Sequence, residues 1–126
     1  MQAFATKRVP QDVDVLAPDG SDVRLLCQTQ RGSMAHFTLG PGEVSKAVAH
    51  RTVEEIWFFV AGSGRFWRQQ NGTEETMEVT AGLSLTIPTG THFQFRNDGA
   101  EPLVAVGVTM PPWPGEDEAF FVEGVW

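Results

Sequence analysis

One histidine and one glutamate in the stretch AHRTVEEIWFFVAG are the residues best placed for chemistry. Four residues separate His50 from Glu55, enough for the chain to turn from one extended segment into an adjacent strand. We therefore expect the two side chains to lie within hydrogen-bond reach of each other. An imidazole beside a carboxylate can bind a cation, act as an acid–base pair, or form a buried hydrogen bond with no further role. The spacing leaves these three interpretations open.

A second histidine depends on the alternation of the strand IPTGTHFQFRN. Uninterrupted alternation places Phe93, Phe95 and Asn97 on the inner face. His92 then lies on the outer face or at the rim. A β-bulge before Asn97 would instead point His92 inward. The regular pattern favours Phe93 as the inward residue.

The composition limits the partners and the compartment. Sixteen acidic residues against nine Lys plus Arg give a net charge of -7, which argues against nucleic acid and against an anionic membrane surface. No apolar run approaches the roughly 20 residues that span a bilayer, and the N-terminal stretch lacks the apolar segment of a signal peptide. Cys27 is the only cysteine, so no internal disulfide can form and we expect a cytoplasmic protein.

Short apolar or alternating runs separated by Gly, Pro, Asn and Asp predict an all-β fold over one domain, residues 1–126. Residues 12–28 read as two strands joined by a Pro-Asp-Gly turn, and residues 54–70 as a hairpin folded at Gly62–Gly64. The acidic runs 73–78 and 115–119 are interpreted as solvated. The Pro- and Trp-rich tail, residues 111–126, either lies over the barrel or exchanges with a partner subunit.

The spacing of glycines and polar residues over residues 32–110 resembles the two motifs of the cupin superfamily. The first motif corresponds to Gly42-x5-Val48-x-His50-x4-Glu55-x6-Gly62. The second corresponds to Gly82-x5-Pro88-x-Gly90-x2-Phe93-x3-Asn97. At two of these positions, Val48 and Phe93 stand where the family usually has a histidine.

The resemblance implies an antiparallel jelly-roll β-barrel (the cupin fold) with the functional site at its mouth. Typical members bind a divalent metal through three histidines and the glutamate, of which this sequence keeps only His50 and Glu55. An open metal site generally needs three protein ligands, so we favour no metal cofactor. The metal-dependent alternative takes His50, Glu55 and His92 as the ligands of a divalent ion.

The predicted cavity wall is mostly apolar with a few polar groups, as in sites for small organic ligands. The alternative is a filled core that admits no ligand, since small barrels can pack their interior with side chains. Its residues are Val48, His50, Glu55, Trp57, Phe93 and Phe95, with His92 at the rim. Two functions fit such a cavity. One is a metal-independent isomerase, epimerase, cyclase or lyase that uses His50 and Glu55 as acid and base, chemistry that the resemblance to cupins allows. The other is a non-catalytic metabolite-binding or sensor module.

The stretch EEIWFFV is apolar on both of its faces. A strand with only one buried face would alternate, so the face carrying Ile56, Phe58 and Val60 needs a cover. The N-terminal segment, the tail or a second subunit could provide it. Cupins commonly dimerise through such a surface, so we predict a homodimer.

Overall fold

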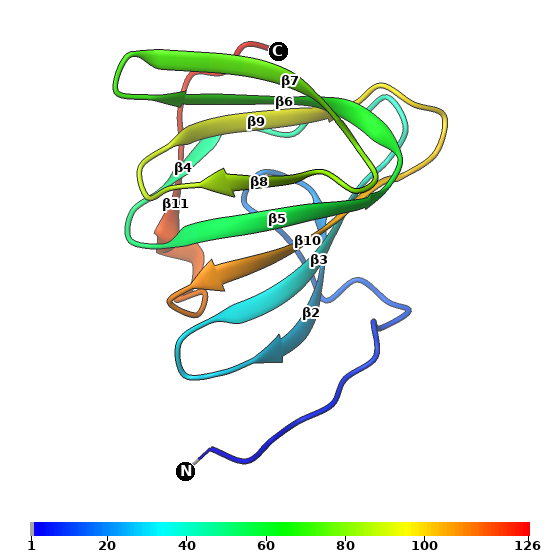
Figure 1. The fold of residues 1–126 in the computed structure, drawn as a ribbon, viewed down its shortest axis with the longest axis vertical. Coiled ribbons are helices and arrows are strands. Elements are labelled where there is room, and N and C mark those ends of the chain that lie inside the picture. Colours follow the sequence, from blue (N-terminus) through cyan, green and yellow to red (C-terminus); the bar gives the residue numbers. More distant parts are fainter. Residues whose placement is uncertain (1) are drawn as a thin grey trace.

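Alternating apolar and polar residues form two layers of β-strands in the computed structural model, which describes residues 2–126 (Figure 1). The strands of the first layer are β1 (Val15–Leu16), β2 (Asp22–Gln28), β3 (Ser33–Leu39), β5 (Glu54–Ala61), β8 (Ser84–Ile87) and β10 (Leu103–Met110). The strands of the second layer are β4 (Val48–His50), β6 (Ser63–Gln70), β7 (Thr73–Thr80), β9 (His92–Asn97) and β11 (Ala119–Phe121). One turn of 3₁₀ helix, η1 (Glu116–Glu118), precedes β11.

The two sheets are antiparallel, and the chain passes repeatedly between them. The six-stranded sheet has the order β1-β2-β3-β10-β5-β8, and the five-stranded sheet the order β11-β4-β9-β6-β7. This is the all-β jelly-roll barrel expected from the sequence. Across residues 2–126, no helix has the length and hydrophobicity needed to cross a membrane.

The predicted hairpin at Gly62–Gly64 is wrong, because the chain changes sheet there. Strand β5 pairs with β10 and β8, whereas β6 pairs with β7 and β9. Gly62 has a φ of 87°, and a Cβ at this position would lie 2.5 Å from the carbonyl oxygen of Pro102. The crossing therefore requires glycine both for its backbone conformation and for space.

An aromatic core fills the space between the two sheets. The Phe66 ring stacks on Phe93 at 5.8 Å and on Phe95 at 5.5 Å. The Trp57 ring packs edge-on against Phe66 at 5.6 Å. These side chains are at most 2% exposed, and their burial is the main term that holds the sheets together.

The outer face of β5 is only partly covered by the rest of the described residues. Trp57 points inward, whereas Ile56, Phe58 and Val60 point outward and are 49%, 44% and 43% exposed. The strand is therefore apolar on both sides but buried on only one.

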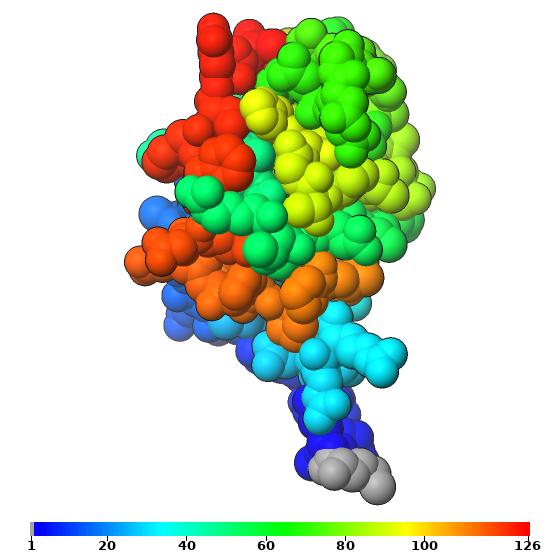
Figure 2. Space-filling view, turned by 90° about the vertical axis from the view of Figure 1, so that its left-hand side faces the viewer, coloured from blue at the N-terminus to red at the C-terminus, as the bar shows by residue number. Residues whose placement is uncertain are grey.

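The C-terminal tail lies against the second sheet of its own chain. Strand β11 pairs with β4, and Figure 2 shows the red C-terminal residues packed beside this blue-green part of the barrel. The Gln94 side chain accepts hydrogen bonds from the backbone of Val125 and Trp126. At the other end of the chain, the N-terminal residues run as an extended segment outside β2, with Phe4 fully exposed (Figure 1).

A buried glutamate anchors the tail. The Glu118 carboxylate in η1 accepts hydrogen bonds from the backbone N–H groups of Thr52 and Val53 and from the Thr52 hydroxyl. Burial alone would raise the pKa of this carboxyl, but the three hydrogen bonds outweigh burial and hold the pKa below its usual value. The expectation that residues 115–119 are all solvated is therefore wrong for Glu118, which is only 5% exposed.

Candidate functional site

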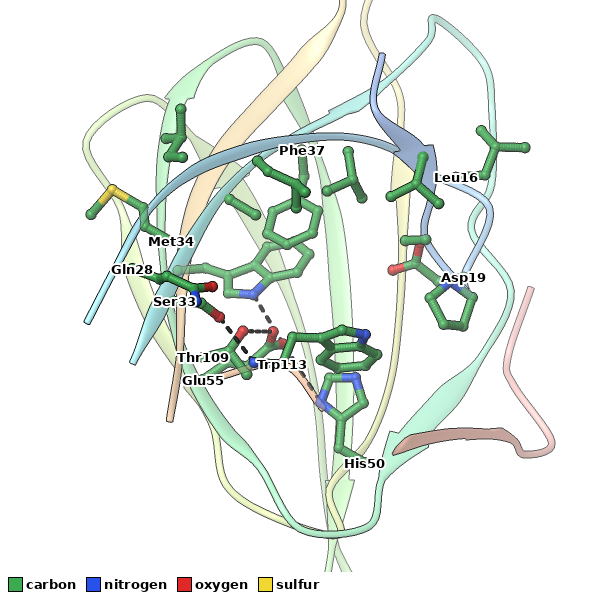
Figure 3. Close-up of a pocket in the computed structure, with 18 of the residues that line it drawn as sticks. Leu16, Asp19, Gln28, Ser33, Met34, Phe37, His50, Glu55, Thr109 and Trp113 are labelled. Carbon is green, nitrogen blue, oxygen red and sulfur yellow. Dashed lines mark hydrogen bonds and ion pairs between the residues drawn. The ribbon is translucent and has the colours of Figure 1, made fainter. Parts of the chain in front are cut away.

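A cavity of about 710 Å³ lies between the two sheets. Strands β2, β3, β5 and β10 of one sheet and β4 and β9 of the other contribute side chains to it (Figure 3). Strand β1, the turn between β1 and β2, the N-terminal segment and the start of the tail complete the wall. The volume falls within the range of roughly 300–1,000 Å³ that is usual for small-molecule sites.

Glu55 lines this cavity with both of its carboxylate oxygens hydrogen-bonded. Its Oε1 accepts a hydrogen bond from the Thr109 hydroxyl at 3.0 Å, and its Oε2 accepts one from Trp57 Nε1 at 3.2 Å. Burial raises the pKa of Glu55 to about 7 although both hydrogen bonds lower it. The negative charges of Asp19 and Glu118 also raise the pKa. Near neutral pH the carboxyl is therefore present in both protonated and ionised forms.

His50 is buried beside this carboxyl and is 6% exposed. Its ring packs edge-on against Phe93 at 5.3 Å and against Trp113 of the tail at 5.1 Å. Burial lowers the pKa of His50 to about 4, although the negative charge of Glu118 opposes this shift. The imidazole is therefore neutral at physiological pH.

The two groups face each other across the gap between the sheets, as Figure 3 shows. His50 Nδ1 lies 3.7 Å from Glu55 Oε2, slightly too far for a hydrogen bond. Within residues 2–126, Nδ1 has no hydrogen-bond partner. The expectation of two adjacent strands in hydrogen-bond contact is therefore wrong, since β4 and β5 belong to different sheets.

The cavity wall includes most of the residues expected from the sequence: Val48, His50, Glu55, Trp57 and Phe93. Two expected residues lie elsewhere. Phe95 shares the inner face with Phe93 but lies in the core, stacked on Phe66. His92 is partly exposed opposite Gln69 of β6, outside the described cavity lining.

Several lining residues were not found by sequence analysis. Asp19 comes from the Pro-Asp-Gly turn and is 5% exposed, with Oδ1 accepting hydrogen bonds from the Ser21 backbone N–H and hydroxyl. Burial raises the pKa of Asp19 above its usual value. Phe37 of β3 stacks on Trp57 at 4.6 Å. The sequence predicts a turn at Asp19 and an alternating strand at Phe37. Neither pattern predicts what these side chains will face.

The polar groups of the cavity do not fit a metal centre. Among the described residues no three His, Cys, Asp or Glu side chains are grouped closely enough to hold an ion. Val48 and Phe93 present apolar side chains beside His50, and His92 lies outside the cavity. The alternative ligand set of His50, Glu55 and His92 is therefore not brought together, and we derive no chemistry from a metal.

The sequence profile of the cupin domain matches residues 35–109. The chain belongs to the cupin family. This match spans both motif regions and the cavity-lining strands from β3 to β10, but not β1 and β2. No curated protein matches this cupin at a significant level.

Solved structures with the same fold are similar to this cupin at low sequence identity. A Klebsiella pneumoniae protein with a double-stranded β-helix domain has a TM-score of 0.67 and 19% identity, over 86% of this chain and 89% of that chain. A Bacillus halodurans protein has a TM-score of 0.67 and 22% identity, over 74% and 72% of the two chains. An oxalate decarboxylase of Lactobacillus farciminis has a TM-score of 0.71 and 22% identity, over 81% of this chain but 31% of that chain. These similarities establish the fold.

Proposed function

We propose that this cupin binds a small, mostly apolar organic molecule in the cavity and moves a proton on it, with Glu55 as the acid–base group. The observation that carries the proposal is a buried carboxyl with a pKa of about 7 at the cavity wall. A group whose pKa matches the working pH both accepts and donates protons effectively. The reactions that fit are isomerisation, epimerisation, cyclisation and elimination, each of which moves a proton without redox chemistry.

The neighbouring side chains give each group a defined role in this proposal. Thr109 and Trp57 fix both oxygens of Glu55, so that the carboxyl keeps one orientation while its proton moves. The neutral His50 imidazole offers its unpaired Nδ1 to a polar atom of the ligand. The apolar wall excludes water, which strengthens both interactions.

The proposal is tested with a ketone that fits an apolar cavity and carries an acidic C–H, such as 2-tetralone. The protein is incubated with this probe in D₂O, and deuterium incorporation is followed by NMR. We expect catalysed exchange whose rate depends on a group with a pKa near 7. The substitution Glu55→Gln should lower the rate by about 100-fold or more. Glu54→Gln, an exposed neighbour outside the described cavity lining, should leave it unchanged.

A non-catalytic binding module is the second candidate. It is favoured by apolar residues of the wall that lie on β1 and β2 and on the start of β3, including Leu16, Val23 and Met34. These side chains contribute binding surface and no acid–base chemistry. Exchange no faster than in buffer, together with a metabolite that remains bound in native mass spectrometry of Glu55→Gln, would establish this function and contradict the enzymatic one.

A further inference from the structure

We propose that the ligand of this cavity carries a protonated amine, which lies between His50 and Glu55. This inference rests on the proposed binding function and adds the chemical class of the ligand. Three independent features support it: the charges that line the cavity, the spacing between His50 Nδ1 and Glu55 Oε2, and the aromatic wall.

The buried charge of the cavity is acidic. The titratable groups that line it are Lys7, Asp19, His50, Glu55 and Glu116. Asp19 and Glu55 are buried, at 5% and 4% exposure, whereas Lys7 and Glu116 are exposed. His50 is neutral and adds no positive charge. A bound cation would offset the repulsion between the two buried carboxyls, whereas an anion would add to it.

The distance between His50 and Glu55 allows one ligand atom to form hydrogen bonds with both side chains. Nδ1 and Oε2 are 3.7 Å apart, so a nitrogen about 2.9 Å from each can donate to both. A primary ammonium group has several N–H donors, whereas a hydroxyl has one and a quaternary ammonium has none. His50 Nδ1 is buried, has no partner within the described part of the chain, and lines the cavity. In the neutral tautomer that carries its proton on Nε2, Nδ1 accepts a hydrogen bond from an ammonium N–H.

The wall around this gap is aromatic. Trp57 and Phe37 stack on one side, and Phe93 and Trp113 pack edge-on against His50. Aromatic faces carry partial negative charge and tolerate a cation better than an anion. They also accommodate an apolar body attached to the amine. The best-fitting ligand is therefore an aryl- or alkyl-ammonium ion.

Binding of such a cation would be coupled to proton release. A positive charge beside Glu55 favours the ionised carboxylate and lowers its pKa from about 7. At pH 6.5 to 7, part of the carboxyl population must then lose its proton when the amine binds. Affinity should therefore increase as the pH rises through 7.

Isothermal titration calorimetry with matched probes tests the inference. The probes are phenethylammonium, 2-phenylethanol, phenylacetate and phenethyltrimethylammonium, which share one aromatic body. We expect phenethylammonium to bind at least about tenfold more tightly than each of the other three. Its binding heat at pH 6.5 should vary with the ionisation enthalpy of the buffer in the direction of proton release.

Substitutions in the cavity identify the side chains that cause the preference for the amine. Glu55→Gln should abolish the preference for the amine, and the matched exposed variant Glu54→Gln should retain it. Circular dichroism of each variant shows whether it is folded, and Asp19→Asn gives an independent reduction of the cavity charge. Equal or tighter binding of the alcohol or of phenylacetate would overturn the amine inference but leave the proposed binding function intact. Equal binding of the quaternary ion would overturn the bridging geometry, and therefore the inference. No binding of any probe would overturn both.

Discussion

Burial inverts the usual order of protonation between His50 and Glu55. The two side chains lie 3.7 Å apart on strands of opposite sheets. The pKa of the imidazole is lowered to about 4 and that of the carboxyl is raised to about 7, in both cases mainly by desolvation. When the pH falls from alkaline values, the carboxyl is therefore protonated before the imidazole. A pair of this kind avoids the buried ion pair that ordinary pKa values would produce.

The first prediction follows from the raised pKa of Glu55. The folded protein binds this proton more tightly than the unfolded chain, so the carboxyl lowers stability as the pH rises from about 4.5 to about 7. Glu55→Gln removes that loss. The unfolding free energy of Glu55→Gln relative to wild type should increase by about 3 kcal/mol across this range. Urea unfolding at pH 4.5 and pH 8 measures it. If the unfolding free energy of Glu55→Gln relative to wild type is the same at both pH values, the raised pKa of Glu55 is contradicted. Glu54→Gln is the control, and its difference from wild type should not change with pH.

The second prediction concerns the anchor of the tail. Glu118→Ala leaves the part-buried N–H of Thr52 and the buried N–H of Val53 without an acceptor. We expect the unfolding free energy to fall by about 2 kcal/mol and hydrogen exchange to increase across residues 111–126. Asp117→Ala, an exposed neighbour in η1, should change stability by no more than about 0.5 kcal/mol. Unchanged exchange in Glu118→Ala would show that β11 and the Gln94 hydrogen bonds hold the tail without Glu118.

The third prediction concerns metal content. Because the described residues bring no three potential metal ligands together, the wild-type protein should purify with well under one equivalent of Zn, Fe, Mn or Ni, measured by elemental mass spectrometry. Val48 and Phe93 are cross-strand partners on β4 and β9. The double substitution Val48→His and Phe93→His should therefore create a four-ligand site with affinities in the usual order for divalent metals. A stoichiometric metal in wild type that disappears in His92→Ala would contradict this assignment.

The fourth prediction concerns self-association through β5. Ile56, Phe58 and Val60 form an exposed apolar strip on the six-stranded sheet, and we expect a second copy of the chain to cover it. Sedimentation velocity should detect a dimer in wild type and a monomer in Phe58→Glu. Phe121→Glu changes an exposed phenylalanine on the other sheet and should remain dimeric. A monomeric wild type at high concentration would refute the dimer.

The sequence contained most of the fold but not the connections between its strands. Period-two alternation on β5 and β9 predicted which side chains point inward, because that pattern follows from pleat geometry. The glycines at Gly62 and Gly64 suit either a hairpin or a crossing between sheets. The choice between a hairpin and a crossing depends on which strands pair with β5, and these are β8 and β10. These partners are distant in the sequence and leave no local signal.

The candidate site was predictable on β4, β5 and β9, which carry the recognised motifs, and was missed on β3, on β10 and on the loops. Alternation predicted that Phe95 points inward, but it did not predict how far along the barrel the side chain lies. Phe95 packs in the core and not in the cavity wall. Asp19 and Trp113 come from a turn and from the tail, where no periodicity constrains the direction of a side chain. Glu118 appeared to belong to a solvated acidic run because the groups that donate hydrogen bonds to its carboxylate, on Thr52 and Val53, are remote in the sequence.

The central position of β10 has a consequence for folding kinetics. This strand pairs on one side with β3, some 70 residues earlier in the chain, and on the other side with β5. Such non-local pairing slows folding to the order of milliseconds to seconds, since long loops must close before the contacts stabilise them. The same strand carries Thr109, which orients Glu55. The arrangement of Glu55 and Thr109 therefore forms together with the complete barrel, and a fragment that ends before Leu103 would have neither.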